Sequence, residues 1–95
     1  MEYKPKDISV IIPTMNRTKE LLETISYIPD TIKEIIIIDQ GNEEQSWKEN
    51  LHKNIPIKII HSDIPSITIA RNKGLQYATG NLICYIDDDV TVKTR

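Results

Sequence analysis

Four short apolar runs divide the chain, at residues 8–12, 35–38, 57–60 and 82–86. They are rich in isoleucine and valine and show little alternation between apolar and polar positions. β-Branched residues favour strands, and strands that are covered on both faces lack the alternation of half-exposed strands. The pattern therefore predicts four strands of a parallel sheet.

Helical patterns lie between these runs. In the first, apolar residues fall on one helical stripe, and Pro29 would end the helix because it lacks an N–H donor. A second, short helix is expected over residues 42–51. The third is expected over residues 66–79, with Gly80 ending it. Its small residues recur every four positions and would let the helix approach the sheet closely; they are Ala70, Gly74 and Ala78.

The order of these elements limits how the sheet can be built. Strands and helices alternate, and crossovers between parallel strands are right-handed, so the favoured strand order, numbered along the chain, is 3-2-1-4. The reversal between strands 1 and 4 opens a crevice at the carboxyl ends of the strands, where open α/β sheets bind ligands. We therefore expect a Rossmann-like α/β domain. Strand 4 would be an uncovered edge that invites a homodimer.

Composition and charge narrow the class of protein. The 95 residues are 39% hydrophobic and 27% charged, which suits a small globular domain. The net charge is −2, and acidic and basic residues are interspersed along the chain. This pattern does not indicate binding to nucleic acid, which needs clustered basic residues. No apolar run approaches the roughly 20 residues that cross a bilayer, and a cytoplasmic location is expected. The lone cysteine, Cys84, is expected to be a small buried residue.

Polar segments follow three of the predicted strands, at residues 13–17, 39–42 and 87–89. In a parallel sheet these segments share one rim. Three consecutive carboxylates at 87–89 repel one another unless a divalent cation lies among them, and hard oxygen ligands favour Mg²⁺ or Mn²⁺. Substrate phosphates often complete such a site, so a diphosphate is the expected partner. Taken alone, the acidic run is more typical of a solvated turn, but its position after a buried strand favours the cation site. Asp39 is equally typical of a turn or capping carboxylate.

Four segments together resemble family 2 glycosyltransferases in order and spacing. Residues 9–17, Ser-Val-Ile-Ile-Pro-Thr-Met-Asn-Arg, resemble the opening Ser-Val-Ile-Ile-Pro-Thr/Ala-Tyr-Asn segment of that family. Residues 34–39 are similar to its second strand, which ends in an Asp that contacts the nucleotide. Residues 70–74 resemble its Ala-Arg-Asn-x-Gly helix, and residues 85–89 its Asp-x-Asp strand end.

The resemblance implies a GT-A fold and an inverting, metal-dependent transfer from a nucleoside-diphosphate sugar, in the first place a UDP-sugar. Asp39 would accept a hydrogen bond from the base, and Arg71 would approach the nucleotide or diphosphate. Asp87 would lie near the ribose. The residues assigned in this way to the nucleotide are Pro13, Thr14, Asn16, Asp39, Arg71, Asp87 and Asp88, and the ligand assigned to Mn²⁺ or Mg²⁺ is Asp89.

The resemblance covers residues 8–90, and the six residues that follow Asp89 contain no acid. In the family the catalytic base and most of the acceptor pocket lie beyond the Asp-x-Asp segment. We therefore expect residues 1–95 to be a nucleotide-sugar-binding half-domain, truncated after that strand and inactive in transfer when alone. The other acids are expected away from the crevice. His52 and His61 are expected to be structural, and His61 has no evident partner in the sequence.

Two segments depart from the family pattern. Residues 39–42 read Asp-Gln-Gly-Asn, where the family often has Asp-Asp-Gly-Ser, so Gln40 replaces a carboxylate. Residues 65–69 begin with proline, where the family often has glycine before Ala-Arg-Asn, and this stiffens a loop. The first change bears on the choice of base and the second on the fit of the diphosphate.

Three other classes of protein share parts of the pattern. A receiver-type signalling domain places paired acids after strand 1 and a phosphoacceptor Asp after strand 3, where this chain has Pro13-Thr14 and His61-Ser62. A sugar nucleotidyltransferase needs a glycine-rich loop after strand 1, and residues 13–17 contain no glycine. A non-enzymatic nucleotide-binding α/β module remains an alternative.

Overall fold

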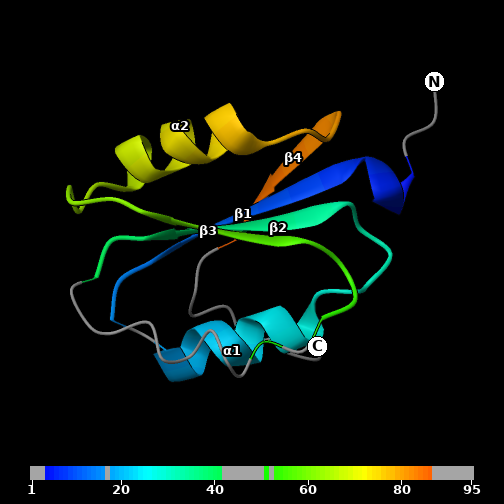
Figure 1. The fold of residues 1–95 in the computed structure, drawn as a ribbon, viewed down its shortest axis with the longest axis horizontal. Helices are drawn as coiled ribbons and strands as arrows, with labels where there is room; N and C mark the ends of the chain where they lie inside the picture. The colour runs from blue at the N-terminus through cyan, green and yellow to red at the C-terminus, as the bar shows by residue number, and fades with distance from the viewer. Residues whose placement is uncertain (1–3, 17, 42–50, 52, 87–95) are drawn as a thin grey trace, which may run out of the picture.

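The computed structural model describes residues 4–16, 18–41, 51 and 53–86. Its elements are the 3-10 helix η1 (Pro5–Asp7), β1 (Ile8–Thr14), α1 (Thr18–Tyr27), β2 (Glu34–Asp39), β3 (Ile57–His61), α2 (Ile67–Tyr77) and β4 (Leu82–Tyr85). The strands form one parallel sheet in the order β3-β2-β1-β4, with α1 on one face and α2 on the other (Figure 1). The predicted strand order is confirmed. Most of the predicted second helix, at 42–50, lies outside the described residues.

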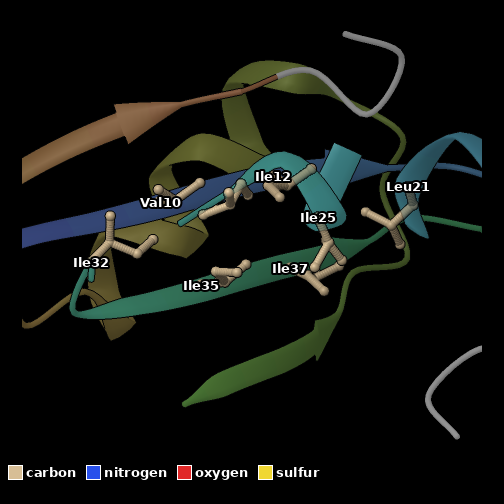
Figure 2. Close-up of a cluster of buried hydrophobic side chains, with 8 residues drawn as sticks. Val10, Ile12, Leu21, Ile25, Ile32, Ile35 and Ile37 are labelled. Atoms are coloured by element: carbon tan, nitrogen blue, oxygen red, sulfur yellow. The ribbon is translucent and has the colours of Figure 1, made fainter. Parts of the chain in front are cut away.

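Two apolar layers cover the two faces of β1 and β2. Successive strand residues point to opposite faces, so alternate residues enter different layers. The layer on the α1 side is the cluster drawn in Figure 2, made of Val10, Ile12, Leu21, Ile25, Ile28, Ile32, Ile35 and Ile37. The layer on the α2 side consists of Ile11, Ile36, Ile38 and Ala70. Burial on both faces explains why β1 and β2 show no alternation in the sequence.

Glycines set how closely the chain packs around α2. A Cβ on Gly74 would lie 2.6 Å from the Ile11 Cγ2 atom, so the helix rests directly on the sheet as the small-residue spacing predicted. The helix ends at Tyr77, and the prediction that Gly80 ends it was wrong. Gly80 is needed for another reason, because a Cβ there would lie 2.5 Å from the Asp7 carbonyl oxygen.

The β4 strand is an exposed edge. Among the described strands it pairs with β1, while α2 packs over β1 and β2. Cys84 is therefore exposed, and the prediction of a buried cysteine on a strand covered on both faces was wrong. An apolar hollow of about 290 Å³, lined in part by Tyr27, Cys84 and Ile86, lies beside this edge. A homodimer through β4 stays a prediction.

Candidate functional site

A pocket of about 300 Å³ lies at the carboxyl ends of β1, β2 and β3, the edge at which the sequence predicted a site. The register brings these three ends level, because Thr14 pairs with Asp39 and Asp39 pairs with His61. The pocket is lined by Met15, Asn16, Gln40, Gly41, His61, Ser62, Asp63 and Pro65. Of these, Asn16 was assigned to the nucleotide in advance.

The floor of this pocket is a tight turn after β2. Gly41 donates its N–H to the Asp39 Oδ1 atom at 2.9 Å, and a Cβ on Gly41 would lie 2.9 Å from the Asn16 nitrogen. Asn16 itself has φ of 54°, a left-handed conformation that asparagine tolerates better than most residues. A side chain larger than that of glycine at position 41 would therefore clash with Asn16 and displace the end of β2 from the end of β1.

Three predicted nucleotide residues lie at this edge but are buried and do not line the pocket. Pro13 and Thr14 end β1 and are buried, and the Thr14 carbonyl accepts the Gln40 N–H at 2.8 Å. Asp39 is 5% exposed, and its bond to Gly41 confirms the turn role that the sequence left open. A carboxylate has lone pairs for several donors.

His61 and Asp63 form a pair that sequence reasoning missed. The His61 Nε2 atom lies 2.8 Å from the Asp63 Oδ1 atom, and the Lys73 Nζ atom donates to the His61 carbonyl at 3.1 Å. The expectation that His61 has no partner was wrong. Asp63 lines the pocket at the ends of β1, β2 and β3. The signal in the sequence was a histidine at a strand end with an acid two residues later, a spacing from which the pair could have been predicted.

Arg71 lies on α2 with its guanidinium carbon 5.1 Å from the centroid of the Tyr85 ring on β4. This is a cation–π distance. Its buried Nε atom has no hydrogen-bond partner among the residues that the structure describes. A buried donor without an acceptor costs about 1–3 kcal/mol.

The remaining predicted site residues, Asp87, Asp88 and Asp89, lie outside the described residues, as does His52. Within the described ranges, no three His, Cys, Asp or Glu side chains gather as a metal site. The described chain stops at Ile86, whose N–H donates to the Ile11 carbonyl at 3.0 Å.

A second polar cluster, at the opposite end of the sheet, centres on Glu34. Its Oε2 atom accepts the Ser9 hydroxyl at 2.6 Å and the Thr79 N–H at 2.7 Å, and its Oε1 atom lies 3.0 Å from Lys58 Nζ. Burial alone would raise the pKa of the Glu34 carboxyl. The donors around it outweigh burial and lower that pKa from its ordinary 4.5 to about 2. This cluster joins strand starts to the end of α2 and is structural.

Comparison with known proteins identifies the family. Residues 9–95 match the model of glycosyl transferase family 2. The chain belongs to this family. This family 2 chain is 31% identical over 88 residues to the uncharacterized glycosyltransferase YibD of Escherichia coli K12, covering 86% of this chain and 26% of YibD. It is 28% identical over 90 residues to a dolichol-phosphate mannosyltransferase of Pyrococcus furiosus, covering 87% of this chain and 26% of that protein.

Solved structures agree on the fold of this family 2 chain. The crystal structure of Staphylococcus aureus TarS residues 1–349 superposes with a TM-score of 0.66 at 24% identity. That match covers 86% of this chain and 27% of the TarS chain. The GT-A type of fold is thereby confirmed. The chain spans about a quarter of the length of these relatives. None of the described helices combines the length and apolarity needed to cross a membrane.

Proposed function

We propose that this chain binds the nucleoside diphosphate of a sugar donor at the carboxyl edge of its sheet. The observation that carries the proposal is the pocket at the ends of β1, β2 and β3, built around Asn16 and Gly41 above Asp39, in a chain of glycosyl transferase family 2. The pocket would take the base and ribose. A UDP-sugar is the donor to test first, because the uracil N3–H is a donor that an Asp39 carboxylate can accept.

Arg71 is proposed to bind the diphosphate. Its guanidinium can engage two phosphate oxygens at once, and its Nε lacks an acceptor among the described residues. The ring of Tyr85 would hold the guanidinium in place from the β4 side. Ligand oxygens at Arg71 would remove the cost of its buried, unpaired N–H.

Asp89 is proposed as a ligand of Mn²⁺ or Mg²⁺, with Asp87 and Asp88 directed to the nucleotide. Carboxylates are the donor type that these hard cations prefer, so the chemistry of residues 87–89 fits the ion. A bound cation would supply positive charge against the diphosphate. Inverting transfer of the sugar is proposed for a protein that also holds an acceptor and a general base within about 3 Å of the acceptor hydroxyl. Residues 1–95 alone are proposed to be a half-domain that binds the donor without transferring it.

Calorimetric titration tests this proposal. UDP, GDP and CDP are titrated into the chain with and without Mn²⁺, and into Asp39→Asn and Asp89→Asn. Asp39→Asn keeps an oxygen for the Gly41 N–H but loses the charge, so we expect about tenfold weaker binding of UDP with or without Mn²⁺. Asp89→Asn should remove the strengthening by Mn²⁺, because an amide is a poorer ligand for a hard cation.

Asp30→Asn is the matched control. Asp30 pairs with Lys53 after α1, and the same chemical change there should leave the affinity unaltered. Binding that is equal in all four chains and indifferent to Mn²⁺ would remove the proposed site.

A further inference from the structure

Gln40 connects three parts of the nucleotide edge. Its main-chain N–H donates to the Thr14 carbonyl at 2.8 Å. Its side-chain Nε2 atom donates to the carbonyl oxygens of Ile64, at 2.9 Å, and Ser66, at 2.7 Å. The end of β2 is thus tied to the end of β1 and to the segment that leads from β3 into α2.

The two side-chain bonds require an amide. Both acceptors are carbonyl oxygens, so both hydrogens of the Nε2 atom are used and the orientation of the amide is determined by its partners. A carboxylate is an acceptor without hydrogens when ionised, and it would meet two carbonyl oxygens without a proton between them. The departure from the Asp-Asp-Gly-Ser pattern at Gln40 therefore has a geometric reason in this chain.

The segment that Gln40 holds forms one wall of the pocket and the start of α2. Residues 62, 63 and 65 line the pocket. Ser66 caps α2, since its Oγ accepts the Ile69 N–H at 3.3 Å. Arg71 follows one turn further along the same helix. A displacement of this segment would change both the width of the pocket and the position of Arg71.

We propose that Gln40 is a positioning residue for donor binding, whose amide fixes the segment 62–66 against the nucleotide. This inference rests on the proposed function. It assigns to Gln40 no contact with the ligand, and its effect passes through the pocket wall and the first turns of α2.

The test compares Gln40→Glu and Gln40→Ala with the wild-type chain, with Gln76→Glu as control. Gln76 is exposed on α2, so the same chemical change there lies outside the pocket. The first measurement is hydrogen exchange without ligand. Both Gln40 variants should exchange faster in residues 62–70, while the buried strand β2 and the Gln76→Glu chain should match wild type.

The second measurement is the affinity for UDP with Mg²⁺ between pH 7.5 and pH 5. Two lost hydrogen bonds should weaken binding about tenfold or more at pH 7.5 in both Gln40 variants. Acidification should recover part of the loss in Gln40→Glu, because a protonated carboxyl can donate one hydrogen bond. Gln40→Ala should not recover. The titratable neighbours Asp39, His61 and Asp63 are the same in every chain, so each variant is compared with wild type at the same pH.

Three results would overturn the inference. Wild-type affinity in Gln40→Glu would show that the amide is unnecessary. Weaker binding in Gln40→Glu with unchanged exchange would show that the new charge repels the diphosphate directly. Wild-type affinity in Gln40→Ala would show that the two hydrogen bonds to Ile64 and Ser66 do not contribute to donor binding. If the wild-type chain binds no nucleoside diphosphate, the proposed function fails and Gln40 cannot position a donor, while hydrogen exchange still decides whether it holds the segment.

Discussion

Replacing Glu34 with glutamine should destabilise the fold without touching the nucleotide edge. Glu34 is 3% exposed, and its carboxylate accepts the Ser9 hydroxyl and the Thr79 N–H at the amino end of the sheet. The substitution keeps the volume and removes the charge. It also places an amide group among donors that were directed at a carboxylate.

The pKa of Glu34 sets the size of the effect. A fall from 4.5 to about 2 corresponds to about 3.5 kcal/mol of folding free energy at about 1.4 kcal/mol per pKa unit. The Lys58 side chain is 39% exposed, so solvent screens its share, and we expect a loss of about 2–3 kcal/mol. For a domain of this size such a loss lowers Tm by about 10–20 °C.

Urea unfolding at pH 7 and at lower pH values is the assay. Because the pKa is lowered in the folded chain, the stability from Glu34 is present above about pH 4.5 and is lost as the pH falls toward about 2. The wild-type and Glu34→Gln chains should therefore converge in unfolding free energy over that interval. Glu23→Gln, on the exposed side of α1, is the control and should match wild type within about 0.5 kcal/mol. A difference between wild type and Glu34→Gln that stays constant from pH 7 to pH 2 would refute the reasoning.

Three further predictions concern α2 and β4. Tyr85→Leu should weaken UDP binding about two- to fivefold by removing the ring beside Arg71, whereas Tyr85→Phe should not; equal titrations for both variants would count against the cation–π contact. Gly74→Ala should cost about 1–3 kcal/mol in urea unfolding, despite the higher helix propensity of alanine, because its Cβ would meet Ile11 at 2.6 Å; a stabilised variant would show that α2 is free to shift. Cys84 should react with a thiol reagent in the native chain nearly as fast as in urea, and protection until unfolding would contradict an exposed edge.

The sheet could be predicted from sequence because its information is local. Runs such as residues 35–38 specify a strand buried on both faces, and the alternation with helices leaves few strand orders. The close approach at Gly74 followed from helical spacing within α2. The exposure of Cys84 could not be predicted in this way, since it depends on what packs beside β4 and not on the residues of β4.

The candidate site could be predicted in position and only partly in detail. The predicted strand ends identified the edge of the sheet that carries the pocket, and they identified Asn16 as a residue of the site. The Glu34 cluster joins residues up to 45 positions apart, and no local pattern marks such a contact. Gln40 was visible as a departure from a family pattern, but its two acceptors became apparent only in three dimensions. The pair of His61 and Asp63 lay within reach of a spacing argument.

An NMR titration of the isotope-labelled chain with UDP and Mg²⁺ would locate the bound nucleotide directly. For UDP bound at the carboxyl edge of the sheet, we expect shifts to concentrate in residues 14–16, 39–41 and 61–63, and the Arg71 Nε–H signal to move as it gains an acceptor. The amides of Glu34 and Gly80, at the opposite end of the sheet, should stay unchanged. Shifts confined to that opposite end or to the apolar hollow beside β4 would place the nucleotide elsewhere. An Arg71 signal that does not move at saturation would exclude Arg71 as a diphosphate ligand.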